Sequence, residues 1–239
     1  MRIRAVAAKE LRSYFNSPIA YIVVIAFLVF TSIWFFYLNR FFALNEASLR
    51  VWFGVVPTVF IFLIPAITMR SWAEERKTGT LEVLMTLPFR EYEVVLGKFA
   101  GALGLLLLLM ALTLPLPLSL APLGRFDAGQ IVGEYLGVLL IGASGIAVGL
   151  LLSSISTNQI TAFILSGLAL LFLTLIHQVG AVAPLPRWLS SLTVWISFAA
   201  HYDGFRKGLL DSRDLVYFLL VITLSLALNT WILIQRKWK

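Results

Sequence analysis

The stretch from Tyr135 to Pro186 reads YLGVLLIGASGIAVGLLLSSISTNQITAFILSGLALLFLTLIHQVGAVAPLP and contains no Asp, Glu, Lys or Arg. A helix needs about 20 mostly apolar residues to cross the ~30 Å hydrocarbon layer of a bilayer, because it rises about 1.5 Å per residue. The stretch is therefore too long for one crossing, and the polar run from Ser153 to Gln159 divides it. This pattern predicts two consecutive membrane-spanning helices, at residues 131–152 and 159–177.

The rest of the chain has the same character. Of its 239 residues 60% are hydrophobic and 13% are charged, whereas a soluble domain carries about 25% charged residues. This small number of polar residues cannot cover an apolar core. Lipid must therefore be the outer solvent. The sequence predicts an all-α integral membrane protein, a single transmembrane domain over residues 1–239. Four further apolar runs bring the number of expected spans to six: residues 18–38, 51–69, 99–120 and 215–234.

Composition also excludes several classes of function. The chain has no cysteine, so disulfides, zinc–thiolate sites and thiol nucleophiles are excluded. The net charge of +7 comes from scattered basic residues, which argues against a nucleic-acid partner. His177 and His201 stand outside any metal-ligand spacing. We therefore expect no catalytic residue, no metal site and no cofactor in this chain.

The basic residues predict the orientation. If the N-terminus lies in the cytoplasm, 12 Lys and Arg residues fall on the cytoplasmic side and 7 on the other. Cytoplasmic loops carry the excess of Lys and Arg, so we expect both termini inside a plasma membrane, taken as a bacterial cytoplasmic (inner) membrane. The first apolar run has full spanning length, which favours a retained span over a cleaved signal peptide.

Two of the segments outside the spans predict helices that do not cross the bilayer. Residues 2–16 place Ile3, Val6, Ala7, Leu11, Tyr14 and Phe15 on one face, with basic residues mostly off it, which predicts an interfacial amphipathic helix; a plain polar tail is the alternative. Between spans five and six, Trp188 to Tyr202 is uncharged but too short to cross. A pair of re-entrant or interfacial helices fits this segment.

The loop from Arg70 to Lys98, between spans two and three, is the most charged segment. Ser71 and Glu74 have capping-box spacing, which predicts a helix starting at Ser71. Gly79 can end or bend this helix, and Pro88 can end a second stretch that follows it. The loop is expected to form a helical hairpin on the cytoplasmic face. The pattern leaves two readings open: a docking element for a soluble partner, or a solvated loop.

The run AEERKTGTLEVLMTLPFREYEVVLGK, residues 73–98, resembles the first cytoplasmic loop of ABC-2 type transporter permeases. The matching elements occur in the family's order: Glu74, Glu75, Arg76, Gly79, Thr80, Leu81, Glu82, Leu87, Pro88, Gly97 and Lys98. The amphipathic start, the six spans and the short helices before the last span match the family's plan. Residues 197–218 resemble the subgroup related to gliding-motility and copper-enzyme-maturation permeases.

The resemblance implies an exporter subunit without enzymatic activity of its own. It implies two separate ABC ATPase subunits that bind Mg-ATP, and a second permease copy or paralogue, with an auxiliary or periplasmic partner as a further expectation. The sequence agrees, because Gly97-Lys98 lacks the rest of the G-x-x-x-x-G-K-[ST] phosphate-binding pattern. The implied ATPase-coupling loop comprises Trp72, Glu74, Glu75, Arg76, Gly79, Thr80, Leu81, Glu82 and Pro88.

Two other functions stay open at this point. A membrane anchor or mechanotransmitter for an ABC ATPase would have the same sequence features without moving cargo. An intramembrane enzyme would need paired catalytic residues within the spans, which the sequence does not suggest. The identity of the cargo does not follow from the sequence.

The fourth span, residues 131–152, contains the remaining candidates. Glycines at small-xxx-small spacing let helices approach closely, so Gly137, Gly145 and Gly149 predict either helix packing or the lining of a substrate path. Glu134 lies near the outer edge of this span and is expected to be a boundary charge. Contact with cargo is the alternative if it faces the bundle, because acidic residues in membranes are costly and often functional.

Overall fold

The computed structural model describes residues 2–44, 48–80, 90–124, 126–182 and 186–237. These residues form helices joined by short turns, with no strand among them. The α-helices are α1 (Arg2–Phe15), α2 (Pro18–Ile33), α3 (Phe41–Leu44), α4 (Arg50–Lys77), α6 (Glu91–Thr113), α7 (Pro115–Leu120), α8 (Ala128–Ile155), α9 (Gln159–Val182), α10 (Arg187–Ile196), α11 (Phe198–Arg206) and α12 (Ser212–Lys237). A π-helical turn (Trp34–Leu38) extends α2, and a 3₁₀ turn (Ala121–Leu123) follows α7.

Six of the helical segments are long and apolar enough to cross a membrane, within the described part of the chain. Each predicted apolar run lies inside one of them, so the six-span, all-helical architecture is confirmed. The six segments are Pro18–Leu38, Arg50–Lys77, Glu91–Leu120, Ala128–Ile155, Gln159–Gly180 and Ser212–Gln235.

Local chemistry sets several helix ends. Ser17 caps α2, its hydroxyl accepting from the N–H of Ile19, and proline follows in the first turn, where its missing N–H costs nothing. Asp127 caps α8 by accepting two backbone N–H groups. The predicted polar break between spans four and five is the turn Ser156–Asn158.

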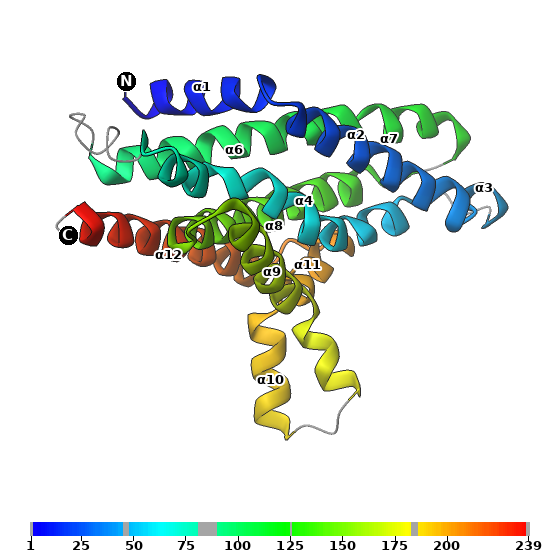
Figure 1. Cartoon of the computed structure of the whole chain (residues 1–239). Helices are drawn as coiled ribbons and strands as arrows, with labels where there is room; N and C mark the ends of the chain where they lie inside the picture. Colours follow the sequence, from blue (N-terminus) through cyan, green and yellow to red (C-terminus); the bar gives the residue numbers. More distant parts are fainter. Residues whose placement is uncertain (1, 45–47, 81–89, 125, 183–185, 238–239) are drawn as a thin grey trace.

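Helices α4 and α8 form the centre of the bundle. Their most apolar windows are 67% and 72% buried, whereas those of the other four spans are 22–39% buried. Helix α4 packs against α8 and α9, and α12 covers another side of α8 (Figure 1). The outer spans expose apolar side chains such as Leu168 and Phe172, which is expected where lipid is the solvent.

The spans run between two ends of the bundle. The N-terminus, the C-terminal end of α12 and the turn after α4 lie at one end, at the left of Figure 1, and α3 and the end of α7 lie at the other. We call the first of these the terminal end. The predicted placement of both termini on one side fits this arrangement, and the identity of that side stays a prediction.

Helix α1 packs along the first half of α6. Its predicted apolar stripe faces α6 through Val6, whereas Arg4, Lys9 and Arg12 are exposed. The stripe differs from the prediction at Phe15, the last residue of α1, which is exposed and contacts the ring of Tyr21 in α2. The interfacial position of α1 stays a prediction.

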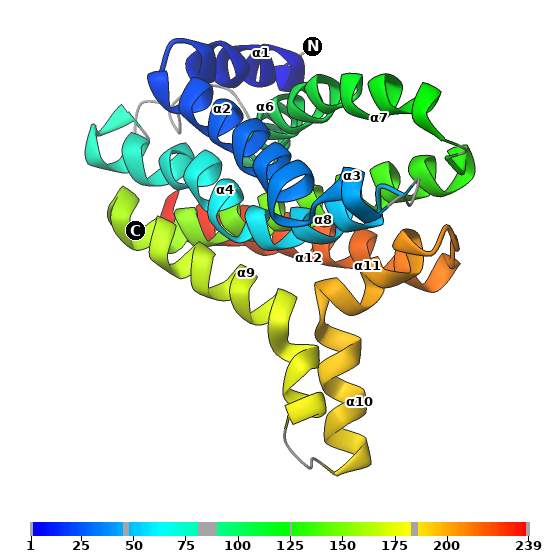
Figure 2. The ribbon, with the colours of Figure 1, turned by 90° about the vertical axis from the view of Figure 1, so that its right-hand side faces the viewer.

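Two short helices, α10 and α11, lie between the fifth and sixth spans, where short helices were predicted. Helix α11 packs on α8, α9 and α4, while α10 pairs with the end of α9, and this hairpin projects from the bundle (Figure 2). Their depth relative to a membrane stays a prediction.

The expectation that a helix starts at Ser71 is wrong. Helix α4 runs without interruption from Arg50 to Lys77, and Ser71 is a buried residue inside it rather than an extended capping residue. The residues on both sides of Ser71 are helical, whereas a cap stands before the first turn of a helix. Gly79 does follow the end of the helix, with φ of 72°. The second half of the predicted hairpin lies outside the described residues.

Candidate functional site

A buried lysine lies at the terminal end of the bundle, where α1, α4 and α6 meet. Lys98, in the second turn of α6, has a side chain that is 1% exposed. Its Nζ donates to Glu10 Oε1 of α1 and to the backbone oxygen of Ser71 of α4, each at 2.8 Å. It also lies 2.9 Å from Glu75 Oε1 and 4.7 Å from the centre of the Trp72 ring.

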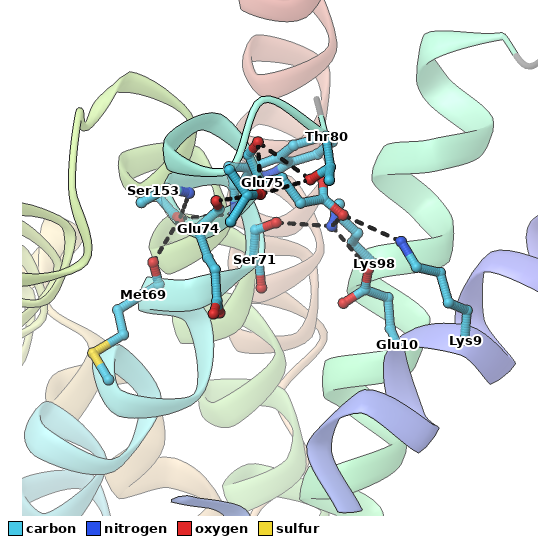
Figure 3. Close-up of polar contacts among 12 residues, drawn as sticks. Lys9, Glu10, Met69, Ser71, Glu74, Glu75, Thr80, Lys98 and Ser153 are labelled. Carbon is cyan, nitrogen blue, oxygen red and sulfur yellow. Dashed lines mark hydrogen bonds and ion pairs between the residues drawn. The ribbon is translucent and has the colours of Figure 1, made fainter. Parts of the chain in front are cut away.

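We call this group the Lys98 cluster: Lys9, Glu10, Ser71, Trp72, Glu75 and Lys98. Figure 3 shows the ammonium of Lys98 between the carboxylates of Glu10 and Glu75. Lys9 is the outer member, 63% exposed and 3.4 Å from Glu75. Two cations and two carboxylates balance, which is the arrangement that a buried ion needs if it is to keep its charge.

Two glycines bring α1 close enough to form the cluster. A Cβ added at Gly97 would lie 2.5 Å from Val6 Cβ, and one at Gly101 would lie 2.6 Å from Glu10 Cβ. Gly97-x-x-x-Gly101 thus provides the small-xxx-small surface that lets two helices approach closely. Because the backbones nearly touch here, Glu10 reaches Lys98 of the facing helix.

Tyr14 extends the α1–α4 contact toward α2. Its hydroxyl donates to the backbone oxygen of Ile67 at 3.3 Å. Burial raises the pKa of this phenol, and the neighbouring Glu10 carboxylate adds to the rise, while a hydrogen bond with Ser71 opposes it. Tyr14 therefore stays a neutral donor, and it fixes the end of α1 to the body of α4.

Arg76 joins the end of α4 to the end of α8. Its Nη1 donates to the backbone oxygens of Ser156 at 2.6 Å and Ile155 at 3.3 Å, and its Nη2 donates to Ser154. These are the last carbonyl groups of α8, which lack partners within the helix. A guanidinium at this position also complements the negative end of the helix dipole.

One turn earlier, Ser153 of α8 makes a second connection to α4. Its Oγ accepts from the backbone N–H of Trp72 at 3.2 Å and donates to the backbone oxygen of Met69 at 3.3 Å (Figure 3). Trp72 itself is fully buried. The last two turns of α4 are therefore bonded to α8 on one side and to α6 and α1 on the other.

The remaining described residues of the predicted coupling loop close the end of α4. Glu74 makes a double ion-pair contact with Arg70, its oxygens lying 2.8 and 3.0 Å from the guanidinium nitrogens. Thr78 Oγ1 donates to the backbone oxygen of Glu74, and Thr80 Oγ1 donates to that of Glu75. The predicted residues Leu81, Glu82 and Pro88 lie outside the described part of the chain.

The structure thus brings Trp72 and Glu75 together around Lys98. The side chain of Arg76 instead contacts the end of α8. Sequence reasoning gave Lys98 no part of its own and missed Glu10 entirely. A signal for Glu10 was present, because it falls four residues from both Val6 and Tyr14 on the buried face of α1. The spacing Gly97-x-x-x-Gly101 was a second signal.

The candidates in α8 lie away from the Lys98 cluster. Added Cβ atoms at Gly137, Gly145 and Gly149 would lie 2.3–2.7 Å from side chains of α4 and α11, so these glycines are sites of close helix packing. Glu134 is fully buried and its Oε1 accepts from Gln130 Nε2 at 3.0 Å, whereas its Oε2 has no hydrogen-bond partner among the described residues. A role of these residues in a substrate path stays a prediction.

Histidine and carboxylate side chains do not gather into a metal site in the described ranges, where no group of three or more could hold an ion. His201 instead pairs with Asp214, with 2.7 Å between Nδ1 and Oδ1, and stacks on Tyr217. These contacts fix α11 to the start of α12.

Comparison with known proteins gives consistent matches. Residues 42–234 match the family model described as ABC-2 family transporter protein. Two curated relatives, from Escherichia coli strain K12 and Escherichia coli O157:H7, are each named "Probable multidrug ABC transporter permease YbhR". Each is 30% identical over 200 residues, covering 78% of this chain and 53% of the relative. The chain therefore spans about half the length of the curated relatives it matches.

Proposed function

This chain belongs to the ABC-2 transporter family, and we propose that it is the permease subunit of an ATP-driven exporter. The observation that carries the proposal is the Lys98 cluster, which connects the end of α4 to α1 and α6 beside the predicted ATPase-coupling loop. A separate ATPase is proposed to bind Mg-ATP and to act on that loop, since the chain lacks the phosphate-binding pattern.

The geometry supports a mechanical role for α4. It is one continuous helix of 28 residues, so a force on its end near Gly79 reaches the opposite end of the bundle, ~40 Å away at 1.5 Å per residue. Arg76 would carry the same force into α8, and the Lys98 cluster would carry it into α6. Because α4 and α8 form the centre of the bundle, their displacement changes the packing of every span.

The working assembly is proposed to contain two copies of the permease, or this chain and a paralogue, with two ATPase subunits. The terminal end would lie on the cytoplasmic side of a bacterial inner membrane. The printed name of the relatives supports small molecules as the cargo. The likeness of residues 197–218 to gliding-motility and copper-enzyme-maturation permeases stays a prediction.

Cysteine labelling tests the proposal directly, because the chain contains no cysteine. In a Thr80→Cys variant, we expect maleimide labelling to fall strongly when the partner ATPase binds in membranes. Thr80 is exposed and is itself one of the predicted coupling residues. A Lys207→Cys variant, at an exposed position between α11 and α12 near the opposite end of the bundle, is the control and should be labelled equally with and without the ATPase.

Two outcomes would contradict the proposal. If Thr80→Cys is labelled at the same rate in the assembled complex, the ATPase does not bind at this loop. If the assembled complex hydrolyses ATP without any flux of small molecules into inverted vesicles, the chain is a membrane anchor or mechanotransmitter rather than an exporter subunit.

A further inference from the structure

A charged cavity lies between α1, α2, α4 and α6 at the terminal end. It has a volume of about 560 Å³, and it is lined by the end of α1, the start of α2 and the last turns of α4. Its charged lining residues are three basic and three acidic: Lys9, Arg70, Lys98, Glu10, Glu74 and Glu75.

An apolar groove of about 390 Å³ lies between α2 and α4. Thr58 is the polar exception among its lining residues. The aromatic walls are open to the outside, since Phe30 is 47% exposed and Phe62 is 64% exposed. Both residues belong to spans, so this outside is the hydrocarbon layer of the membrane.

The two spaces adjoin each other. Val23 of α2 and Ala66 of α4 line both the charged cavity and the apolar groove. A single ligand that fills both must therefore carry a charged group at one end and a hydrocarbon chain at the other. In a membrane protein, with the charged cavity at the end of two spans and the groove along them, that description fits a phospholipid of the adjoining leaflet.

The charges of the cavity select the head group. Lys98 is enclosed by Glu10 and Glu75, so the more exposed pair of Arg70 and Glu74, with side chains 31% and 38% exposed, faces an incoming ligand. An anion alone would meet three carboxylates. A head group with both a phosphate and an ammonium meets a partner for each charge.

Arg70 is positioned to bind the phosphate. Its Nη1 donates to Ser17 Oγ at 2.6 Å and its Nη2 donates to Glu74 Oε1 at 3.0 Å. Each of these nitrogens carries a second N–H, which can donate to a phosphate oxygen as guanidinium groups commonly do. The carboxylate of Glu74, beside it, can accept from a primary ammonium.

We propose that the charged cavity and the adjoining groove together hold one resident phospholipid with a primary ammonium, such as phosphatidylethanolamine. The head group occupies the charged cavity beside Arg70 and Glu74, and one acyl chain lies in the groove between α2 and α4. The lipid would thus contact both α1 and α4 beside the Lys98 cluster. This inference does not depend on the ATPase or on the cargo.

Native mass spectrometry tests it on the full chain. The protein is reconstituted in nanodiscs of equal parts phosphatidylethanolamine, phosphatidylcholine and phosphatidylglycerol with the same acyl chains, and is then released into mild detergent. We expect one retained phospholipid per chain, with phosphatidylethanolamine enriched about threefold to tenfold, because charge-assisted hydrogen bonds discriminate among head groups.

Variants separate the parts of the site. Ala66→Trp fills the junction and should abolish retention, Phe62→Ala removes exposed acyl-chain contact and should reduce it, and Arg70→Gln should remove the preference among head groups. Ala227→Trp, at an exposed position of α12 outside both spaces, is the matched control and should retain the lipid. Phe62→Ala changes an exposed side chain, so it remains informative if Ala66→Trp does not fold.

Several results would overturn the inference. The proposed site would be excluded if the unaltered protein retains no phospholipid, or if Ala66→Trp and Ala227→Trp retain equal amounts. Enrichment of phosphatidylglycerol over phosphatidylethanolamine would overturn the assignment of the head group. A retained detergent or other small molecule in place of a phospholipid would overturn the assignment of the occupant.

Discussion

The ammonium of Lys98 lies 2.8 Å from the carboxylate of Glu10, although 88 residues separate them along the chain. This pair connects the N-terminal helix to the third span, and Glu75 on the other side of Lys98 connects the second span. Three helices that a coupling force would have to move together thus share one buried cation.

Replacing Lys98 with methionine is expected to lower the free energy of unfolding by ~3–5 kcal/mol, because two largely buried carboxylates then face each other without a partner. Denaturant or thermal unfolding in mild detergent measures the change. Lys9→Met is the control: its side chain is 63% exposed, so the loss should be about 0–1 kcal/mol. Adding Glu10→Gln to Lys98→Met should recover part of the loss. Equal effects of the two lysine variants would show that the cluster is not a stabilising unit.

Arg76→Ala is expected to reduce ATP-dependent flux while the protein still inserts and assembles. The change removes the connection to the last carbonyls of α8, and single positions in coupled networks modulate coupling by about 0.5–2 kcal/mol, or roughly 2- to 30-fold. The neighbouring Lys77→Ala, at an exposed position, serves as the control. Normal flux per ATP in Arg76→Ala would exclude a coupling role for this residue.

Gly101→Ala is expected to destabilise the protein by about 1–3 kcal/mol, because overpacking forces the backbone to shift. The added Cβ would lie 2.6 Å from Glu10 Cβ and 3.2 Å from the backbone oxygen of Ala7, so α1 must move away from α6. Gly104→Ala should be neutral or slightly stabilising, since its Cβ would lie 3.4 Å from a methyl group of Leu11 and alanine favours helices. Thermal midpoints of the two variants provide the comparison, and a midpoint for Gly101→Ala no lower than that of Gly104→Ala would exclude close packing at this position.

The orientation can be tested with the same pair of single-cysteine variants. A membrane-impermeant maleimide added to intact cells should label Lys207→Cys and leave Thr80→Cys unlabelled until the cells are opened. The excess of basic residues at the terminal end is the physical reason, since such loops stay in the cytoplasm. The reverse pattern would place both termini outside.

The six spans could be predicted because membrane insertion depends on a local property, the length of an apolar run. Each predicted run falls within a helix of the structure, and the polar turn at Ser156 breaks the uncharged stretch where the sequence indicated. The predicted helix start at Ser71 failed for the opposite reason. A capping pattern has an effect only where a helix begins, and α4 had already begun at Arg50.

The candidate site was predicted in part. The charged residues near Glu75 were found because charge is conspicuous between apolar spans, and the family resemblance assigned them a role. Glu10 was missed because its importance comes from a contact with a residue 88 positions away. Its spacing from Val6 and Tyr14 shows that it shares their helix face, but it does not show what that face meets.

The sequence by itself determined that the chain is a bundle of six membrane-spanning helices with an excess of basic residues on one side. These features follow from hydropathy and charge, which each segment carries before it meets any other. The tertiary structure decided that α1 lies against α6, that Lys98 is shared by two carboxylates, and that a charged cavity lies beside an apolar groove. The first two features depend on how closely α1 approaches α6, and that distance is set by Gly97 and Gly101, which leave room for Val6 and Glu10 of the facing helix.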